Sequence, residues 1–228
     1  MPALTIMKHI CKILKTGFIT HDVKRFILEK PKGLEYLPGQ ATDISINLPD
    51  WKNKKRPFTF TSLNQDKVLE FNIKGYYDHD GVTNKLHQLE PGDEFILRKP
   101  FGTINYQGPG VFIAGGAGIT PFIAILRQLR VDNKISGNTL IFSNKTEKDV
   151  ILEKEFKQMF NEDKLILTLT REENPCYEHG RINKEFLEEK IGNFDQNFYV
   201  CGPPPMVSDL KSILSDLGAT TDEIVFEK

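Results

Sequence analysis

Residues Val111 to Arg130 read V-F-I-A-G-G-A-G-I-T-P-F-I-A-I-L-R-Q-L-R. The stretch begins with a short apolar run, of the length of a buried strand, and continues with a cluster of glycines. Thr120 is a good N-cap, and Pro121 suits the first helical position because its missing N–H group is not needed there. One apolar helix face then follows at the spacing i, i+3, i+4 and i+7: Phe122, Ile125, Leu126 and Leu129. The stretch therefore predicts a strand, a glycine turn and a helix.

A strand, a glycine turn and a helix together can hold a phosphate. Glycines leave room for backbone N–H groups to approach the ligand, and the helix N-terminus adds partial positive charge. The alternative is a tight turn that binds nothing. Both interpretations stay open on this stretch alone, because Pro121 stands where the G-x-G-x-x-G fingerprint has its last glycine.

The composition narrows the class of protein. Among 228 residues, 30 Lys and Arg face 31 Asp and Glu, and this balance argues against a nucleic-acid partner. No apolar run approaches the roughly 20 residues of a membrane span, and the first residues lack the pattern of a signal peptide. We therefore expect a cytoplasmic protein that acts as a monomer.

The cysteines and histidines do not predict a metal or a disulfide framework. Cys11, Cys176 and Cys201 are widely separated, with no C-x-x-C pair, and they are too few for a four-cysteine iron–sulfur cluster. The histidines show no metal-ligand spacing. We therefore expect no metal site.

The first hundred residues consist mainly of short β-type runs separated by turns rich in proline and glycine. Six such runs predict a six-stranded antiparallel Greek-key β-barrel. One helix is expected to interrupt it, with Thr83 as N-cap and with Leu86 and Leu89 as packing residues. The expected strands are Thr5–Leu14, Arg25–Glu29, Thr42–Leu48, Phe58–Thr61, Val68–Lys74 and Glu94–Leu97.

After Phe101-Gly102 the pattern changes to alternating strands and helices, which implies an α/β unit with a five-stranded parallel sheet covered on both faces. The boundary falls in the linker near Gly102 to Gly108, so we expect domains at 1–104 and 105–228. The expected strands are Val111–Ala114, Thr139–Ser143, Leu165–Thr170, Phe198–Cys201 and Glu223–Phe226. The expected helices are Pro121–Arg130, Asp149–Phe160, Asn183–Lys190 and Pro204–Leu217, the last ended by Gly218.

A second stretch, R-P-F-T-F-T-S from Arg56 to Ser62, gathers several binding groups on one expected strand. An arginine can clamp a phosphate, a phenylalanine can lie against a flat ring, and a threonine hydroxyl can hydrogen-bond a ring nitrogen. Taken alone, an amphipathic strand with a surface arginine is the simpler interpretation.

Three motifs in this order resemble the ferredoxin–NADP reductase superfamily. R-P-F-T-F-T-S resembles its R-x-[YF]-[ST]-x-x-S flavin motif, and G-G-A-G-I-T-P resembles its pyridine-nucleotide loop. Y-V-C-G-P-P-P-M, from Tyr199 to Met206, resembles its C-G-P-x-x-M motif beside the nicotinamide. F-S-N-K-T-E-K-D-V, from Phe142 to Val150, further resembles the cytochrome b5 reductase branch. The resemblance covers both halves and implies an FAD-binding barrel followed by an NAD(P)-binding domain.

The resemblance implies a role for each matching residue of the flavin site. Arg56, followed by Pro57, would bind the flavin pyrophosphate, Phe58 would stack on the isoalloxazine, and Thr59 would hydrogen-bond flavin N5. Further cofactor-binding positions are the backbone of Ile73 and Lys74 and the G-x-[ST] helix start at Gly81, Val82 and Thr83.

The dinucleotide site follows in the same way. The resemblance implies a phosphate loop from Gly116, Gly118, Thr120 and Pro121, and a nicotinamide pocket wall from Cys201, Gly202, Pro203 and Pro204. Together with Thr59, Cys201 is expected to be catalytic. Its expected role is to position the nicotinamide rather than to act as a nucleophile, because a buried cysteine is inert unless its pKa is lowered.

The choice of coenzyme stays open. Plant-type members bind the 2′-phosphate of NADPH with a Ser-Arg pair, and this chain has Thr170-Arg171 at that place. Arg171 can pair with a phosphate, yet an arginine before E-E-N also suits a surface ion pair. The T-E-K-D resemblance favours NADH. FAD is the expected flavin, and FMN remains the alternative.

We therefore expect a flavin-dependent oxidoreductase that passes a hydride from NAD(P)H to bound FAD and then electrons to a separate acceptor. Flavodoxin, ferredoxin, a cytochrome and an oxygenase component all fit as acceptors, and K-N-K-K-R at 52–56 can dock an acidic carrier. The alternatives are a non-catalytic nucleotide-binding module and an electron-transfer subunit of a larger complex. The purified protein would be yellow, and would lose this colour when NADH or NADPH is added without oxygen, only if it is the reductase.

Overall fold

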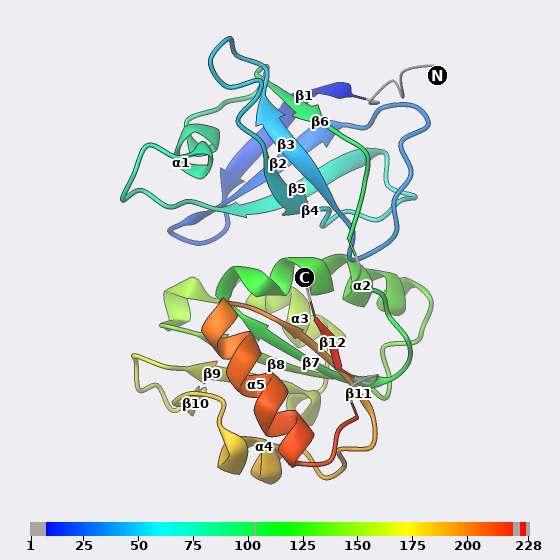
Figure 1. The fold of residues 1–228 in the computed structure, drawn as a ribbon, viewed down its shortest axis with the longest axis vertical. Helices are drawn as coiled ribbons and strands as arrows, with labels where there is room; N and C mark the ends of the chain where they lie inside the picture. The colour runs from blue at the N-terminus through cyan, green and yellow to red at the C-terminus, as the bar shows by residue number, and fades with distance from the viewer. Residues whose placement is uncertain (1–7, 103, 221–223, 227–228) are drawn as a thin grey trace. The chain divides into compact units, whose positions relative to one another are not determined.

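The computed structural model describes residues 8–102, 104–220 and 224–226. The chain separates into two compact units, one up to Gly102 and one from residue 103 onward (Figure 1). Each unit has its own sheet, and each is described by itself.

The first unit is a six-stranded antiparallel barrel, as the short alternating runs predict. Its strands pair in the order β4-β3-β6-β1-β2-β5. The backbone N–H of Thr61, beyond β4, donates to the carbonyl oxygen of Glu70 in β5 at 2.9 Å, so that the barrel nearly closes. The strands are β1 His9–Phe18, β2 Val23–Glu29, β3 Ala41–Ile46, β4 Arg56–Thr59, β5 Val68–Lys74 and β6 Glu94–Leu97.

The first strand departs from its expected bounds. It continues to Phe18, where it pairs with Lys24 of β2, and its register shifts between Ile13 and Lys15. An irregularity of this kind lets one strand serve two neighbours, and residue-by-residue alternation does not reveal it. Residues 5–7 of the expected run lie outside the described residues.

The barrel core is filled by inward-facing aromatic and aliphatic side chains, among them stacked Tyr36 and Phe60 with ring centroids 4.0 Å apart. Helix α1, Val82–His87, adds Val82 and Leu86 to this core, and Leu89 beyond it is also buried. The expected N-cap, Thr83, is wrong. Gly81 occupies the cap position, and Thr83 lies inside the helix, where its hydroxyl accepts a hydrogen bond from the N–H of Tyr76 at 3.4 Å.

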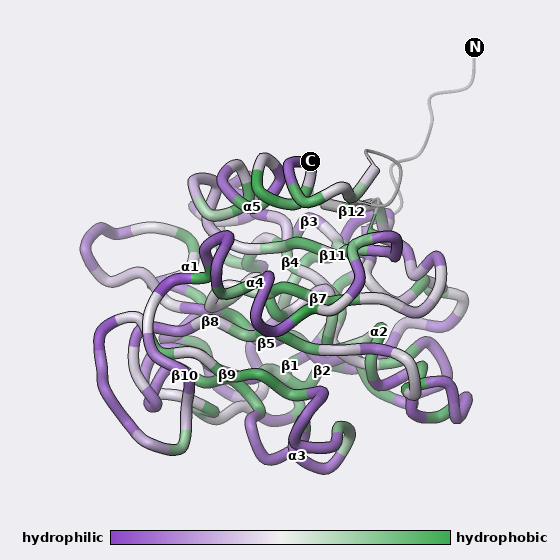
Figure 2. The backbone as a smooth tube through the Cα atoms, turned by 90° about the horizontal axis from the view of Figure 1, so that it is seen from below, coloured by the Kyte–Doolittle hydropathy of each residue, from purple (hydrophilic) through white to green (hydrophobic). Residues whose placement is uncertain are grey.

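The second unit contains a parallel sheet in the order β10-β9-β8-β7-β11-β12. Its strands are β7 Gly110–Gly115, β8 Thr139–Asn144, β9 Leu165–Leu169, β11 Asn197–Cys201 and β12 Ile224–Phe226. These five strands match the expected sheet, although Glu223, the expected start of the last one, lies outside the described residues. A two-residue edge strand, β10 Glu178–His179, adds to the sheet. The central strands are largely green in Figure 2, as expected of strands buried on both faces.

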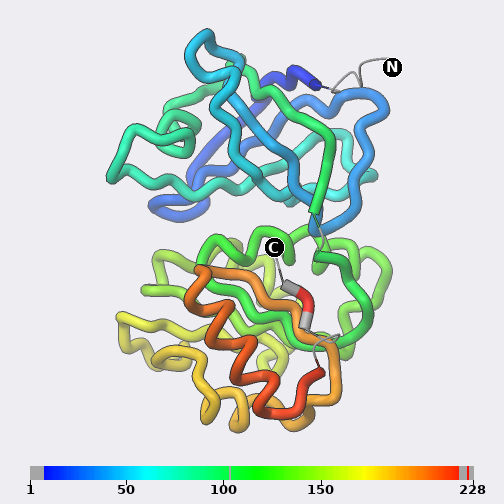
Figure 3. Tube along the Cα trace, viewed as in Figure 1, coloured from blue at the N-terminus to red at the C-terminus, as the bar shows by residue number. Residues whose placement is uncertain are grey.

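Helices cover both faces of this sheet, as the alternating pattern implies. On one face Phe122 of α2, Thr120–Val131, packs edge-on against Phe112, and Phe156 of α3, Glu153–Met159, packs against Phe142. On the other face α4, Lys184–Lys190, and α5, Pro204–Asp216, share one core cluster with β7 and β11. Figure 3 shows α5 in orange to red alongside the sheet.

Two helix starts differ from their expected positions. Thr120 is no N-cap: a 3-10 turn, η1 Gly116–Ile119, leads directly into α2, and the Thr120 hydroxyl donates to the carbonyl oxygen of Ala117 at 3.0 Å. The helix expected from Asp149 also begins later, at Glu153. A 3-10 turn, η2 Glu147–Asp149, comes first, and Leu152, with a φ of 54°, separates it from α3.

The start of α4 and the end of α5 follow ordinary capping chemistry. Asn183 precedes α4, and its side chain accepts a hydrogen bond from the N–H of Phe186, while Gly218, with a φ of 101°, follows the last residues of α5. A third 3-10 turn, η3 Glu162–Lys164, leads into β9. Among the described residues, no helix combines the length and the apolar character that a bilayer span needs.

Candidate functional site

Strand β4 carries the first candidate motif at the edge of the barrel. Arg56 is exposed, and its guanidinium donates to the carbonyl oxygen of Lys55 at 2.9 Å. Phe58 is half-buried against the barrel core. Thr59 is only 9% exposed, yet its hydroxyl makes no hydrogen bond with any residue that the structure describes.

This donor set fits a flavin. A threonine hydroxyl can donate one hydrogen bond and accept others, and that of Thr59 uses none of this capacity within the described part of the barrel. The Thr59 hydroxyl therefore offers a hydrogen bond to a ring nitrogen, and Phe58 and Arg56 on the same strand offer an aromatic face and a cation.

The end of β5 carries the next predicted positions, and its groups are partly in use. The carbonyl oxygen of Ile73 already accepts a hydrogen bond from Nε2 of His87 at 2.8 Å. Lys74 Nζ lies 2.7 Å from Oδ2 of Asp22. The Lys74 side chain is therefore engaged within the barrel, which leaves the backbone of this segment for a ligand, as the resemblance implies.

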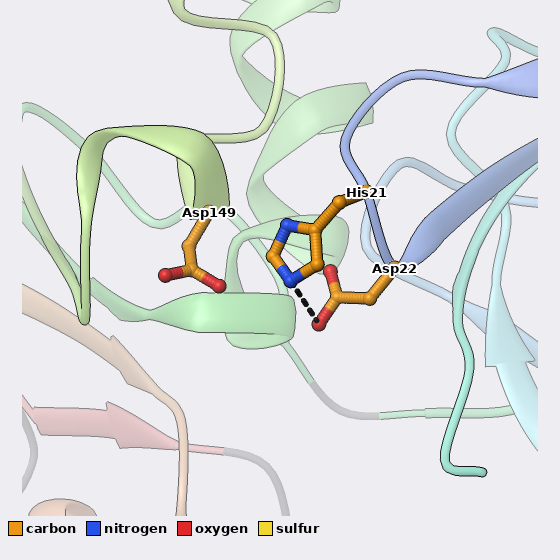
Figure 4. Close-up of side chains that lie close together, drawn as sticks. All are labelled: His21, Asp22 and Asp149. Atoms are coloured by element: carbon orange, nitrogen blue, oxygen red, sulfur yellow. Dashed lines mark ion pairs between the residues drawn. The ribbon is translucent and has the colours of Figure 1, made fainter.

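Asp22 organises the turn before β2. Burial raises its pKa, but hydrogen bonds and charge from Lys74, with help from Thr20 and His21, outweigh burial, so the pKa lies below its ordinary value. Its backbone oxygen accepts from the N–H of Gly75 at 2.7 Å. Figure 4 shows Asp22 beside His21, whose Nε2 lies 3.7 Å from Oδ2 of Asp22. The turn thus holds the end of β5 from one side.

The predicted helix start at Gly81, Val82 and Thr83 is the start of α1. Gly81 has an extended backbone and no side-chain cap, and a Cβ at this position would lie 2.7 Å from the ring of His79. The side chain of Val82 is buried in the core. Only backbone groups and the Thr83 hydroxyl remain for a ligand here.

In the second unit, the glycine loop lies at the carboxyl end of β7. Gly116 has a φ of 52°, and nothing lies within 4 Å of the position of its absent Cβ. A Cβ on Gly118 would lie 2.6 Å from the backbone nitrogen of Gly202. The loops after β7 and β11 therefore approach each other so closely that only a glycine fits between them.

These loops meet where the strand order reverses. Ala114 of β7 pairs with Cys201 of β11, while β8, which follows β7 in the chain, lies on its other side. Ligands of open parallel sheets bind at this kind of position, outside the carboxyl ends of the strands. The structure therefore brings Gly116, Gly118, Cys201 and Gly202 together at one sheet edge.

The remaining predicted residues of this edge differ in what they can offer. Cys201 is buried, while Pro203 and Pro204 are exposed at the start of α5. Pro121 is buried in the first turn of α2. With the hydroxyl of Thr120 engaged by Ala117, any contribution of Thr120 to a phosphate site would have to come from its backbone.

Arg171 follows β9 and is exposed. Its backbone N–H donates to the carbonyl oxygen of Lys145 at 2.9 Å, and its guanidinium has no partner among the described residues. The neighbouring Glu172 is engaged, because it accepts a hydrogen bond from the N–H of Glu147 at 2.8 Å. Arg171 thus remains available to an anion.

Sequence reasoning missed a pair of asparagines at the two ends of β8. Asn138 is 1% exposed, and its amide is bonded to Gly110 N, Tyr106 Oη and the carbonyl oxygens of Lys134 and Ile135. Asn144 is 5% exposed, and both polar atoms of its side chain lack partners among the described residues. An asparagine directly after the expected strand T-L-I-F-S was the available signal.

Both units match known domain families. An oxidoreductase FAD-binding domain model matches residues 10–106, and an oxidoreductase NAD-binding domain model matches residues 112–212. The NADH-cytochrome b5 reductase 1 of Kluyveromyces lactis is 31% identical, with 88% of this chain aligned to 76% of that protein. The NADH-cytochrome b5 reductase 3 of Rattus norvegicus is 28% identical, with 90% of this chain aligned to 83% of that protein.

Solved structures share the fold. The FAD/NAD-binding domain of the nitric oxide dioxygenase of Vibrio cholerae superimposes with a TM-score of 0.84 at 24% identity, over 96% of this chain and 97% of that chain. A ferredoxin NADP+ reductase from Neisseria gonorrhoeae, solved with FAD and NADP, gives 0.82 at 22% identity, over 96% and 98%.

Proposed function

We propose that this chain, which belongs to the family of the NADH-cytochrome b5 reductases, passes a hydride from NAD(P)H to bound FAD and then electrons to a separate acceptor. One observation carries this proposal: a single chain matches an FAD-binding domain and an NAD-binding domain, and the motifs expected for each lie on the matching unit. FAD, when bound, supplies the chemistry that accepts an electron pair and releases electrons to an acceptor.

The barrel residues would bind and orient the flavin. Arg56, with Pro57 holding the strand beside it, would pair with the pyrophosphate, and Phe58 would pack against the ring system. The partnerless Thr59 hydroxyl would hydrogen-bond N5. Backbone groups of Ile73, Lys74 and the helix start at 81–83 would hold the ribityl and phosphate region. Since one lone pair of the Ile73 carbonyl is occupied by His87, we assign this contact chiefly to N–H groups of the segment.

The sheet residues would bind the dinucleotide. Gly116 and Gly118, followed by the backbone of Thr120 and Pro121, would hold its phosphates, and Cys201 to Pro204 would form the wall beside the nicotinamide. Cys201 would act by position, since its buried side chain restricts where the ring can lie. We therefore propose a flavin-binding domain at 1–104 and a dinucleotide-binding domain at 105–228.

For the coenzyme we favour NADH, because the T-E-K-D stretch resembles NADH users. The free guanidinium of Arg171 supports the alternative, since it can bind the 2′-phosphate of NADPH. Comparing NADH with NADPH in Arg171→Gln and in the unchanged protein decides between them. Loss of activity with NADPH alone would show that Arg171 selects the phosphate.

We further propose that the enzyme works in the cytoplasm as a monomer. Its three cysteines are free, which suits a reducing compartment. Cell fractionation tests the location, and light scattering at micromolar concentration tests the oligomeric state.

The decisive test of the reductase proposal uses colour. Purified protein should be yellow, release FAD rather than FMN on denaturation, and bleach without oxygen on addition of NADH or NADPH. Colourless protein that refuses added FAD would end the proposal.

A further inference from the structure

Buried His87, the last residue of α1, is bonded at both ring nitrogens. It is 8% exposed, its Nε2 lies 2.8 Å from the carbonyl oxygen of Ile73, and its Nδ1 lies 2.7 Å from the hydroxyl of Tyr77. A carbonyl oxygen only accepts, so Nε2 must carry the proton. The neutral ring then accepts the Tyr77 hydroxyl at Nδ1.

The surroundings hold this ring neutral. Burial lowers the pKa of His87, and the ammonium group of Lys24 lowers it further, while the bond to Ile73 and the charge of Asp22 act in the opposite direction without prevailing. Lys24 is itself buried beneath α1, where Nζ donates to the carbonyl oxygens of His87 at 3.0 Å and Leu89 at 2.8 Å. Glu90 Oε1, 3.2 Å from Nζ, provides its counter-charge.

The ring also fits tightly against the chain that follows β5. Phe18 and Tyr77 pack edge-on against the imidazole, each with ring centroids 5.6 Å away. A Cβ on Gly75 would lie 2.7 Å from the His87 ring and 2.7 Å from the ring of Tyr77. The absence of a side chain at Gly75 therefore lets both rings close over this segment.

His87 thus joins two segments that lie apart in the sequence. One is the end of β5 with its following turn, Ile73 to Tyr77, and the other is α1, Val82–His87, with its N-cap Gly81. The bond from Tyr76 N to the Thr83 hydroxyl, at 3.4 Å, is a weaker link between the same segments. Both are the segments whose backbone the proposed function assigns to the ribityl and phosphate region of FAD.

Resting on that proposed function, we propose that His87 is a positioning residue for the flavin. Its Nε2–H fixes the Ile73 carbonyl, and its Nδ1 fixes Tyr77, so that the backbone groups of β5 and α1 are held ready for the ligand. Pre-organised groups lose less freedom on binding, and loss of the imidazole should therefore weaken flavin binding rather than alter the redox chemistry.

The test compares two variants. His87→Phe keeps an aromatic ring against Phe18 and removes both hydrogen bonds, whereas His87→Gln keeps an N–H group that can reach the Ile73 carbonyl. Apoprotein is titrated with FAD, followed by the quenching of flavin fluorescence. We expect the Kd for FAD to rise at least tenfold in His87→Phe and to recover substantially in His87→Gln, while the rate of flavin reduction at saturating FAD stays within about twofold in both.

Ile46→Ala serves as the control for a purely structural effect. Ile46 is a buried core residue on β3 and should lower the melting temperature of the apoprotein while leaving the Kd for FAD unchanged. If His87→Phe behaves as Ile46→Ala does, or if His87→Gln binds FAD no better than His87→Phe, His87 does not position the flavin. Failure of the unchanged apoprotein to bind FAD would instead contradict the proposed function itself.

Discussion

Thr59 illustrates how a single side chain can point to a ligand. The residue is 9% exposed and its hydroxyl has no partner among the described residues, which leaves one hydrogen bond that a ligand can make. We expect Thr59→Ala to retain FAD but to slow its reduction by NAD(P)H about tenfold, since one hydrogen bond contributes roughly 1 to 1.5 kcal/mol. Stopped-flow absorbance measures the rate, and Thr59→Ser should restore most of it. Reduction of Thr59→Ala at the normal rate would remove the N5 role.

The two asparagines of β8 should respond oppositely to the same change. Asn138→Leu breaks a satisfied network and leaves the N–H of Gly110 without that acceptor, so we expect a loss of about 2 kcal/mol or more in the free energy of unfolding. Asn144→Leu replaces an amide without partners by an apolar side chain of similar size, and we expect no loss or a small gain. Urea denaturation measures both. Equal destabilisation would mean that Asn144 has a hidden partner, such as a buried water.

His87 should make stability depend on pH in a defined window. Its pKa in the folded protein lies below the ordinary 6.5, so well above pH 6.5 it is neutral in both states and contributes no slope. As the pH falls from 6.5 toward the folded pKa, the unfolded chain binds a proton that the folded chain does not, and stability decreases. Urea midpoints between pH 7.5 and 5.5 should show this decrease, and His87→Gln should reduce it. If the slope of stability against pH is unchanged in His87→Gln, other groups cause the decrease. Asp22 is not one of them, because its pKa is lowered from 3.8 and its effect on stability falls at lower pH.

Secondary structure elements were predictable where their pattern is local. The short β-type runs Val68–Lys74 and Glu94–Leu97, set off by turn residues, predict both strands with their observed bounds. Helix starts were less predictable. Thr120 has the side chain of an N-cap, but the preceding residues already form a 3-10 turn that continues into α2. Helix α3 begins only after Leu152, which has a left-handed backbone conformation. Both outcomes depend on tertiary packing, which a local pattern does not contain.

At the level of elements, the close approach of the loops after β7 and β11 predicts the effect of one methyl group. Gly118→Ala would push a Cβ against backbone atoms of Cys201 and Gly202, which cannot rotate away as a flexible side chain would. We expect a loss of about 2 kcal/mol in stability and a weaker affinity for NAD+. Gly192→Ala is the matched control, since nothing lies within 4 Å of its Cβ position. Calorimetry should show a lower melting temperature and a higher Kd for NAD+ in Gly118→Ala but not in Gly192→Ala. Unchanged values in Gly118→Ala would mean that the two loops can move apart without loss of stability or affinity.

Across the whole molecule, the three motifs predict which segments form the candidate site but not which of their groups are free. The carbonyl of Ile73 and the hydroxyl of Thr120 look available in the sequence, yet His87 and Ala117 occupy them. His87 itself is part of no motif, and only the fold brings it to the end of β5. The reverse holds for Thr59, whose lack of a partner becomes visible only once its neighbours are placed.

The proposed docking of an acidic carrier depends on the surface charge of the barrel unit. Lys52 and Lys54 are exposed just before the flavin strand, and Lys54 lies over the ring of Trp51 with Nζ 4.3 Å from its centroid. Charge reversal at both positions replaces attraction by repulsion, so Lys52→Glu/Lys54→Glu should lower kcat/KM for an acidic cytochrome about tenfold and flatten its dependence on salt. A neutral quinone should be reduced at the normal rate, because it is not steered by charge. An unchanged salt dependence with the cytochrome would place the acceptor surface elsewhere.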